Sequence, residues 1–447
     1  MVGLLAVAAC TASAADVGPP DDQIFFPTGL AIAPDDSVMF VASSNSDLRF
    51  DSGTIDVIDL ALVDSVTSAW LTSGTIPDKC NQDPDHSESL ICDEAQFIKV
   101  GDGVRTGNFA TSIAVQQLGS GSSDPLRLIV PTRGDPSITW ANYAAGKLDC
   151  TTSQGFAICD DDHRLTNIRN DPDLGTISPE PFDAYVDSAN QFAIVTHLET
   201  GDITLVDSPA GGSAVISDVQ YDVFGADPLT GIEGTTAVSG RSPGSADDIV
   251  YVSSRSENRV QMVTVGRPVN NDFPFLILGN FFFESSVGVN AGNSEDTRSI
   301  MFSPDGNTMY LANRLPPTLQ VYDTSPSSTG FPANQLRGVT DICQEVSTGV
   351  VLDSGDGPRI YLACFQDGEV YVVDPSGSVS QENIILAGRG PFSIAAAPTR
   401  QKVYVTNFLE DTIGVIDESP TSATRDRVVL RIGQPKAPDQ TTQESGL

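Results

Sequence analysis

Residues 402–417 read KVYVTNFLEDTIGVID, and this stretch is the clearest copy of a pattern from which nearly all of the chain is built. Its first part, 403–406, consists of β-branched and aromatic residues, which favour a pleated, half-buried strand. The segment 407–411 is polar and prone to turn, and 412–416 is extended again before Asp417 ends the run. Two extended runs joined by a short polar loop predict a β-hairpin.

The same hairpin recurs along the chain. Every copy has a strand rich in β-branched and aromatic residues, a connecting loop and a second strand. The other copies begin near Val38, Leu126, Phe192, Ile249, Met309 and Ile360, so the copy at Lys402 makes seven. The central tyrosines of the last two copies, Tyr361 and Tyr404, lie 43 residues apart.

Each hairpin is flanked by further predicted strands. A strand such as 299–303 precedes the hairpin and ends in turn residues. Another strand follows it, with 97–101 and 384–388 as the clearest and 427–432 as the last. Four antiparallel strands repeated at this period predict an all-β fold, a seven-bladed β-propeller over residues 23–433. A β-sandwich is the structural alternative, but it does not explain seven matched copies.

The formal net charge of the 447 residues is −35. A surface this acidic repels phosphate backbones and anionic lipid headgroups, so we expect no nucleic-acid partner and no direct docking on a membrane. Solubility explains such charge by itself, and cation binding is the alternative interpretation.

Residues 1–22 have the form of an export signal and a flexible tether, because a short apolar run is followed by small residues. Val7-Ala8-Ala9-Cys10 resembles a bacterial lipobox, in which Cys10 would carry the lipid anchor. Cleavage after Ala12-Ser13-Ala14 is the competing interpretation and would discard Cys10. We expect an exported protein at the outer membrane, cell surface or periplasm, in contact with a membrane only through this anchor. Residues 434–447 are expected to be a disordered tail.

Cysteine usage agrees with export. The chain has seven cysteines, and removing Cys10 leaves six, an even number. Six cysteines allow 15 pairings; proximity in sequence favours disulfides between the neighbours in the set Cys80, Cys92, Cys150, Cys159, Cys343 and Cys364. The last pair is predicted on one blade.

Strand order assigns the connecting loops to two faces. The loop into each innermost strand and the loop within each tyrosine-containing hairpin share the upper face; the other loops lie on the lower face. Two long insertions, 72–96 and 142–164, hold the first two cysteine pairs and are predicted on the lower face of adjacent blades. Together they would form a surface for a protein or cell-envelope partner, and decoration without a partner is the alternative.

Acidic and histidine side chains in these insertions are candidate metal ligands. If the insertions touch, carboxylate oxygens would favour calcium and imidazoles would favour zinc or another transition ion. No EF-hand spacing is present, no cofactor is assured, and a solvated acidic loop is the competing interpretation. The candidate ligands are His86, Asp83, Asp85, His163 and Asp161. The third histidine, His197, is expected in an upper surface loop.

The mouth of the central channel is the default ligand site of a propeller. Residues just before the innermost strands are expected to line it, and arginines there could bind a carboxylate or phosphate. The alternative is that they pair with neighbouring glutamates and hold the blades in register. The candidates are Arg105, Glu180, Glu233, Arg298 and Arg389.

The residues 403–407 (VYVTN) together with 414–417 (GVID) resemble the YVTN family of β-propeller repeats. The resemblance covers roughly residues 24–433 and implies a bacterial or archaeal cell-surface protein. Related seven-bladed folds include lactonases of the phosphogluconolactonase type and the large subunit of quinoprotein amine dehydrogenases. Such a fold predicts activity poorly, because function depends on the site that a fold carries.

The sequence contains no Gly-x-Ser-x-Gly elbow, no Cys-x-x-Cys-His and no Walker A motif. We therefore expect an exported, envelope-tethered propeller that acts as a non-catalytic binding or scaffolding module, with no catalytic residue assigned. The alternative is a propeller enzyme, either a lactonase-like hydrolase or a partner-dependent dehydrogenase subunit, with its site at the channel mouth.

Overall fold

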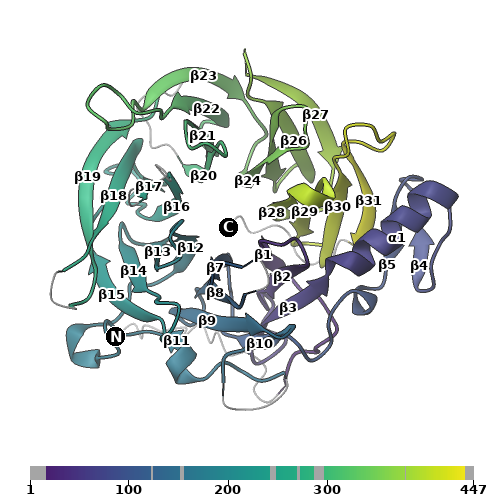
Figure 1. Cartoon of the computed structure of the whole chain (residues 1–447), viewed down its shortest axis with the longest axis horizontal. Coiled ribbons are helices and arrows are strands. Elements are labelled where there is room, and N and C mark those ends of the chain that lie inside the picture. The colour runs from purple at the N-terminus through teal and green to yellow at the C-terminus, as the bar shows by residue number, and fades with distance from the viewer. Residues whose placement is uncertain are drawn as a thin grey trace, which may run out of the picture.

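Seven sheets follow one another around a central axis in the order of the chain, and this arrangement confirms the predicted seven-bladed β-propeller (Figure 1). The computed structural model describes residues 17–121, 124–151, 156–241, 248–268, 272–285, 296–377 and 379–437. The predicted signal and Cys10 lie outside these residues, as does most of the C-terminal tail. Each blade is an antiparallel sheet whose first strand faces the axis.

The strands of the first three blades have the following bounds. Blade 1 contains β1 (Pro27–Ile32), β2 (Val38–Ser43), β3 (Gly53–Asp59) and β6 (Val104–Thr106). Blade 2 contains β7 (Ala114–Gln117), β8 (Leu126–Thr132), β9 (Ser137–Ala144) and β10 (Lys147–Asp149), and β11 (Arg164–Leu165) also pairs with β9. Blade 3 contains β12 (Pro181–Val186), β13 (Phe192–His197), β14 (Ile203–Asp207) and β15 (Val215–Gln220).

The remaining blades repeat the same plan. Blade 4 contains β16 (Thr235–Arg241), β17 (Ile249–Ser254), β18 (Arg259–Gly266) and β19 (Phe275–Phe283). Blade 5 contains β20 (Thr297–Phe302), β21 (Thr308–Asn313), β22 (Thr318–Asp323) and β23 (Gln335–Asp341). Blade 6 contains β24 (Val346–Asp353), β25 (Pro358–Cys364), β26 (Glu369–Asp374) and β27 (Ser380–Leu386). Blade 7 contains β28 (Pro391–Ala397), β29 (Lys402–Asn407), β30 (Thr412–Asp417) and β31 (Arg427–Ile432), joined by β5 (Leu90–Cys92) and β4 (Cys80–Gln82).

The core lies between the blades. Buried apolar side chains of the described residues form seven clusters, one at each junction of neighbouring sheets. The alternation of side chains along each strand supplies both faces of a sheet, and each face packs on the next blade. Hydrophobic burial therefore holds the ring together without a central core.

Closure of the ring depends on the first insertion. Blade 1 comes from the N-terminal part of the chain and blade 7 from the C-terminal part. The four main strands of each blade come from one stretch, so no blade draws them from both ends of the chain. Instead the β4–β5 hairpin, here called the clasp hairpin, leaves blade 1 and adds to the outer edge of blade 7, with β5 parallel to β31. The Gly433 N–H donates to the Cys92 carbonyl oxygen at 2.9 Å, which extends this pairing.

A helix precedes the clasp hairpin. The α1 helix (Leu60–Ser73) begins at Asp59, whose carboxylate accepts from two backbone N–H groups of the first turn, and ends at Gly74 in a left-handed conformation. Leu60 and Val63 are buried at the junction of blades 1 and 7. The Trp70 Nε1 donates to the Glu88 carbonyl oxygen at 2.8 Å and so fixes the helix to the clasp hairpin.

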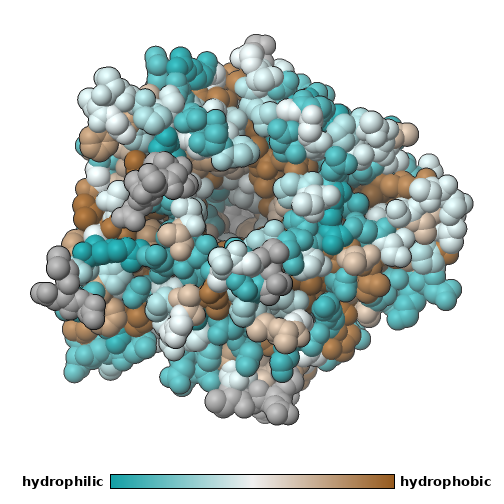
Figure 2. Space-filling model, viewed as in Figure 1, coloured by the Kyte–Doolittle hydropathy of each residue, from teal (hydrophilic) through white to brown (hydrophobic). Residues whose placement is uncertain are grey.

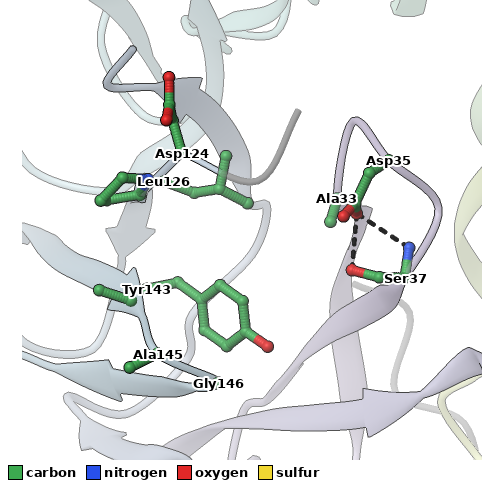
Figure 3. Close-up of a pocket in the computed structure, with 10 residues that line it drawn as sticks. Ala33, Asp35, Ser37, Asp124, Leu126, Tyr143, Ala145 and Gly146 are labelled. Carbon is green, nitrogen blue, oxygen red and sulfur yellow. Dashed lines mark hydrogen bonds between the residues drawn. The ribbon is translucent and has the colours of Figure 1, made fainter. Parts of the chain in front are cut away.

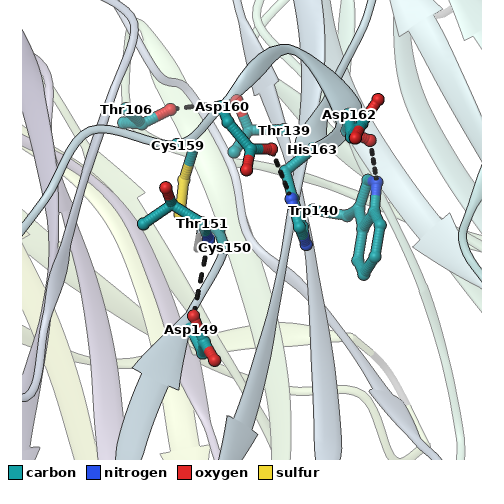
Figure 4. The surroundings of a disulfide bond; sticks show 10 residues. All are labelled: Thr106, Thr139, Trp140, Asp149, Cys150, Thr151, Cys159, Asp160, Asp162 and His163. Atoms are coloured by element: carbon teal, nitrogen blue, oxygen red, sulfur yellow. Dashed lines mark hydrogen bonds and ion pairs between the residues drawn. A yellow bond between two sulfur atoms is a disulfide. The ribbon is translucent and has the colours of Figure 1, made fainter. Parts of the chain in front are cut away.

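The second insertion also reaches a neighbouring blade, in this case blade 1. Residues 157–159 run beside β6, where the Arg105 N–H donates to the Ala157 carbonyl oxygen at 2.9 Å. Figure 4 shows the Cys150–Cys159 disulfide that closes this segment. The two insertions therefore cover outer edges in different sheets. The first insertion adds to the outer edge of blade 7 and the second runs along the outer edge of blade 1, so each covers an edge of the preceding blade in the ring. The partner surface expected from these insertions stays a prediction.

All three predicted disulfides are present, joining Cys80 to Cys92, Cys150 to Cys159 and Cys343 to Cys364. Three disulfides indicate an oxidising compartment and hence export. Among the described residues, no helix has the length and apolar character needed to cross a bilayer. The fourth strand of blade 1 differs from its prediction, because β6 lies at 104–106 and Ile98 makes only a single bridge to Ile58.

Candidate functional site

The upper channel mouth is shaped by irregularities in the innermost strands. In six blades the pairing of the innermost strand with the second strand skips one or two residues, for example between Pro181 and Ala184 and between Thr297 and Ser299. Skipped residues leave the ladder and bend the strand. Some of their hydroxyls bind the next blade, as where Thr236 Oγ1 donates to the Thr297 carbonyl oxygen at 2.6 Å. Others, such as Asp183 and Arg298, carry charge to the channel wall.

Three arginines gather on the side of the mouth formed by blades 2 to 5, here called the arginine side. Arg133 follows β8, Arg255 follows β17 and Arg298 belongs to β20. Burial lowers the pKa of the Arg255 guanidinium, and the positive charges of Arg298 and Arg133 act in the same direction, while the Asp296 and Glu199 carboxylates raise it. A charge shifts the pKa of another group only when the two lie closer than about a Debye length. The three guanidinium groups therefore lie close enough to influence one another.

Two of these arginines are already paired. Arg133 forms an ion pair with Glu180. Arg298 Nη2 donates to Asp296 Oδ2 at 2.8 Å, and its Nε lies 2.7 Å from Oδ1. Arg255 differs, because its Nε donates to the Glu233 carbonyl oxygen at 2.8 Å and no carboxylate of the described residues forms an ion pair with it. A guanidinium has five N–H donors, so Arg255 retains donors for an anion.

A carboxyl group stands beside the arginine side. Asp183 lies in the skipped part of β12, where its carboxylate accepts from the Ala184 N–H at 2.9 Å and from the Val238 N–H at 3.3 Å. Burial raises the pKa of Asp183 to about 6, although these two N–H groups and the Ser112 hydroxyl lower it. A carboxyl with this pKa can exchange a proton near neutral pH.

The opposite side of the mouth is aromatic. Phe26 precedes β1, Phe392 lies in the skipped part of β28, and Phe365 and Phe408 occupy upper hairpin loops. The ring centroids of Phe26 and Phe408 are 5.3 Å apart, and Phe392 lies 6.0 Å from Phe408. These residues from blades 1, 6 and 7, here called the aromatic side, pack as one cluster. Figure 2 shows that the molecule is hollowed near the centre of the ring, which the innermost strands surround.

The structure separates the five residues predicted at the channel mouth. Glu180, Glu233 and Arg298 lie at the start of innermost strands as expected. Arg389 precedes β28 and pairs with Glu410, with 3.3 Å between Nε and Oε1. Arg105 is misplaced in the prediction, because it belongs to the outermost strand of blade 1 and pairs with Asp51 at 2.6 Å. The alternative interpretation, pairing with glutamates that holds the blades in register, is met in part. Arg389 pairs with a glutamate and Arg298 pairs with Asp296, but each pair lies within one blade.

The predicted metal ligands do not come together. The first insertion joins blade 7 and the second joins blade 1, so His86 and His163 belong to different edges. Asp83 forms an ion pair with Arg431, and His163 pairs with Asp160 at 2.7 Å and stacks 4.0 Å from Trp140 (Figure 4). Across the described parts of the chain, no group of three or more His, Cys, Asp or Glu side chains is placed to hold a metal ion. The predicted metal site needed both sets of side chains at one place, and the two insertions run along the edges of two different blades, 7 and 1.

His197 is buried, not in a surface loop as expected. Its Nδ1 lies 3.0 Å from the Pro179 carbonyl oxygen and its Nε2 lies 2.8 Å from Thr204 Oγ1, and burial lowers the pKa of the ring to about 4. Asn407 has the same place in blade 7, where its amide donates to Thr412 Oγ1 at 3.1 Å. The polar residue that ends the second strand therefore fixes the hairpin loop in both blades.

A separate cavity of ≈ 230 Å³ opens on the lower face between blades 1 and 2 (Figure 3). Asp35 and Ser37 line it from the first blade, and Tyr143 lines it from the second. The Asp35 carboxylate already accepts from the Ser37 hydroxyl at 2.6 Å. No convergent set of unpaired donors marks this cavity among its described lining residues, so the channel mouth remains the stronger candidate.

Comparison with known proteins supports the fold. A candidate 6-phosphogluconolactonase from Bacteroides fragilis matches with a TM-score of 0.58 and 13% identity, covering 90% of this chain and 99% of its own. The periplasmic gluconolactonase PpgL of Pseudomonas aeruginosa matches with a TM-score of 0.52 and 16% identity, covering 74% and 88% of the two chains. The β-propeller domain of Cps50 (Swd1) from Myceliophteria thermophila matches at 0.50 and 11%, covering 88% and 96%.

Identities this low show a shared fold and leave activity open. No family model matches the chain, and no curated protein matches its sequence. The resemblance to YVTN repeats therefore stays a prediction, while the seven-bladed architecture is common to this chain and the lactonase-type structures.

Sequence reasoning missed Asp183, Arg255 and the aromatic side. The signal for Asp183 was a Pro-Phe-Asp run at the start of a predicted innermost strand, where blade 7 has Pro-Phe-Ser. Arg255 and Phe408 occupy hairpin loops whose face was assigned correctly, so an alignment of those loops by blade would have placed them together. Their opposition across the mouth depends on the ring, which no single repeat shows.

Proposed function

We propose that the upper channel mouth binds a small molecule that carries an anionic group and an apolar or ring-shaped face. The observation that carries this proposal is the division of the mouth into an arginine side and an aromatic side. The Arg255 guanidinium has donors left over for a carboxylate or phosphate, and the aromatic side offers ring faces for stacking.

Short-range electrostatic contacts, and not the overall field of the protein, favour an anion at this position. The acidic exterior repels anions in solution, so affinity must come from short-range contacts inside the mouth. The ion pairs of Arg133 and Arg298 hold two guanidinium groups in fixed orientations, which reduces the entropy lost on binding.

The test is calorimetric titration of the full chain with gluconate, 6-phosphogluconate and inorganic phosphate as probes. We expect saturable binding of at least one organic probe, and a loss of about tenfold or more in affinity for Arg255→Met, as for a charge-assisted contact. Arg49→Met is the matched control, because Arg49 also lies in an upper loop but pairs with Asp47 at the rim. Absence of binding by every probe, or equal losses in both variants, contradicts the proposal.

Hydrolysis of a lactone is the second candidate, and the raised pKa of Asp183 favours it. A carboxylate near neutral pH can take a proton from the water that attacks a lactone carbonyl, while the neighbouring arginines stabilise the developing oxyanion. The similarity in fold to the two lactonase-type structures supports this choice. A pH-stat assay with glucono-δ-lactone should show a rate above the spontaneous one that rises through pH 6 and is lost in Asp183→Asn; a rate equal to the blank contradicts it.

Export and anchoring complete the proposal. We propose that Cys10 carries a lipid, so that the propeller is held at the cell envelope in contact with a protein or envelope component. Mass spectrometry of the mature N-terminus should find a lipidated Cys10. A chain that begins near Ala15 without modification contradicts the tether but leaves the channel mouth unaffected.

A further inference from the structure

A second cavity on the lower face lies at blade 3 and has a volume of ≈ 430 Å³. Blade 2 contributes the residues that end and follow β7, blade 3 contributes the β12–β13 loop and the end of β14, and blade 4 contributes the residue after β18. These loops join first to second strands or third to fourth strands, so they lie on the face opposite the channel mouth. The lining includes Gln117, Asn190, Asp207, Pro209 and Arg267.

The aspartate in this cavity lacks a hydrogen bond that its counterparts in other blades accept. Five blades end their third strand with an aspartate. In four of them the carboxylate accepts from the backbone N–H two residues further on, at distances from 2.8 to 3.2 Å; these are Asp59, Asp323, Asp374 and Asp417. In blade 3 that position is Pro209, which has no N–H. The Asp207 carboxylate therefore accepts no hydrogen bond from the described residues.

The arginine of the cavity also has no carboxylate partner. Burial raises the pKa of Asp207 and the positive charge of Arg267 lowers it, so the two side chains lie near each other, but they form no ion pair. Asp187, a second carboxylate that Arg267 influences, accepts instead from the backbone N–H groups of Gln191 at 2.6 Å and Phe192 at 2.8 Å. A guanidinium has five N–H donors, so Arg267 has donors available to a ligand.

Buried polar side chains of blade 2 hold the walls of the cavity in place. The Gln116 side chain is fully buried, and its amide donates to the Asn190 carbonyl oxygen at 2.7 Å and to the Ser208 carbonyl oxygen at 2.5 Å. The Arg127 guanidinium donates to Ser208 Oγ at 2.8 Å and to the Gly212 carbonyl oxygen at 2.7 Å. These bonds fix both loops of blade 3 that line the cavity. A ligand would therefore meet ordered walls, which reduces the entropy lost on binding.

We propose that this cavity binds a zwitterionic α-amino acid, whose ammonium group donates to Asp207 and whose carboxylate accepts from Arg267. A simple anion at Arg267 would be repelled by Asp207, and a simple cation at Asp207 would be repelled by Arg267, so a molecule that carries both charges is favoured. The two side chains lie near each other without forming an ion pair, so the charges of a bridging ligand must be a short distance apart, as they are in an α-amino acid. A zwitterion has no net charge, so the net charge of −35 does not repel it.

Equilibrium dialysis of the full chain against radiolabelled L-alanine, L-glutamine and L-phenylalanine, each up to about 10 mM, tests the proposal. We expect saturable binding of at least one of the three. The N-acetyl derivative of that amino acid lacks the ammonium group, and the amide derivative lacks the carboxylate. Each derivative should compete about tenfold or more weakly than the amino acid itself, because it loses one charge-assisted contact.

Asp207→Asn and Arg267→Met should each weaken binding of the amino acid by about tenfold or more. Asp374→Asn is the matched control, because Asp374 ends the third strand of blade 6 but already accepts from the Ser376 N–H at 2.8 Å. The control should bind as the unaltered chain does, and thermal melts should show that all variants are folded.

Three outcomes overturn the proposal. They are the absence of saturable binding by all three amino acids, competition by either derivative as strong as that of the amino acid, and equal weakening by Asp374→Asn. The derivatives test both charges of the ligand on the unaltered chain, so the result does not depend on the folding of a variant. The channel mouth lies on the other face, and its proposed ligand is tested separately.

Discussion

The outer edges of blade 7 and blade 4 differ in whether further strands pair with them. In blade 7 the clasp hairpin adds two strands to β31, and its residues enter a cluster of nineteen buried side chains at the junction with blade 1. In blade 4 no further strand of the described residues pairs with the edge strand β19, and the described cluster at the junction with blade 5 contains eight buried residues. The covered edge lies where the two ends of the ring meet.

This difference shows which junction of the ring requires additional contacts. Six junctions of the ring are formed by blades that follow one another in sequence, and their pairing is local. The seventh joins residues separated by almost the whole chain, so it has the largest loop-closure cost. The first insertion offsets that cost by carrying apolar area, hydrogen bonds and ion pairs from blade 1 onto blade 7. Blade 4 has sequence neighbours on both sides, and no strand added from elsewhere in the described chain pairs with its outer edge.

Truncating one apolar side chain at each edge should separate the two regions most strongly. Leu430 of β31 is fully buried, so Leu430→Ala should lower the free energy of unfolding by about 2–5 kcal/mol. Phe283→Ala in β19 should change it by at most about 0.5 kcal/mol, because that side chain is mostly exposed. Urea denaturation of both variants measures the contrast, and similar losses would show that the β19 edge is covered after all.

Removing the clasp disulfide should have the next largest effect. A bond that closes a 12-residue separation restricts the unfolded chain, so Cys80→Ser with Cys92→Ser should cost about 2–3 kcal/mol. Hydrogen exchange should also rise in β5 and β31, since the hairpin loses its fixed shape. Cys150→Ser with Cys159→Ser is the control with a similar separation of nine residues, and its exchange should rise beside β6 instead. Unchanged exchange in β31 would mean that the hairpin does not close the ring.

The buried ion pair of the clasp should contribute less. Asp83 and Arg431 have side chains that are each 7% exposed, with 3.4 Å between Oδ2 and Nε. Arg431 keeps other partners when Asp83 is neutralised, because Nη1 donates to the Ala387 carbonyl oxygen at 2.5 Å and lies 3.6 Å from Glu410. Asp83→Asn should therefore cost about 1–2 kcal/mol in thermal or urea melts. A stabilised variant would show that desolvation of the pair outweighs its attraction.

Much of the ring could be predicted from the sequence, because its signals are local. Alternation in 403–406 and 412–416 gives strands, and copies of that unit give the number of blades. The three disulfides followed from proximity along the chain. These inferences need only residues that are close in sequence, and hairpins and short loops are specified at that range.

The clasp could not be predicted in this way. The sequence of residues 80–92 gives no signal that they pair with β31, because parallel strands are not joined by a short turn that could be recognised in the sequence. The α1 helix did leave a signal, since Asp59 and Gly74 bracket it as caps, and Leu60, Val63 and Trp70 share one helical face. The predicted metal site assumed that both insertions lie at one place, and nothing in either insertion specifies the blade edge that it joins.

The candidate site was predicted in part for the same reason. Positions before innermost strands were found from the repeat, and Arg298 lies where expected. Arg105 was misplaced because the fourth strand of blade 1 begins later than the apolar run at 97–101 suggested. The grouping of Arg133, Arg255 and Arg298 requires three blades to meet at one axis, which only closure of the ring provides.

The other flank of blade 7 gives the smallest expected effect and shows whether its stability depends on the clasp alone. Glu418 is buried against Tyr361 of blade 6, whose hydroxyl donates to it at 2.5 Å. Burial raises the pKa of Glu418 to about 8, so the folded state binds a proton that the unfolded state releases above about 4.5. This group therefore stabilises the fold fully below that lower pKa, and its contribution is lost as the pH rises through 8. Glu418→Gln keeps the acceptor for Tyr361 but does not titrate, so it should remove about 1 kcal/mol of the stability lost between pH 7 and 8. Urea melts at both pH values measure this loss, and Glu382→Gln at the exposed partner of Arg359 is the control. If the loss is the same in Glu418→Gln and in the unaltered chain, Glu418 is already ionised in the folded state. The junction with blade 6 would then hold a buried charge without an arginine partner, unlike the clasp hairpin, where Asp83 pairs with Arg431.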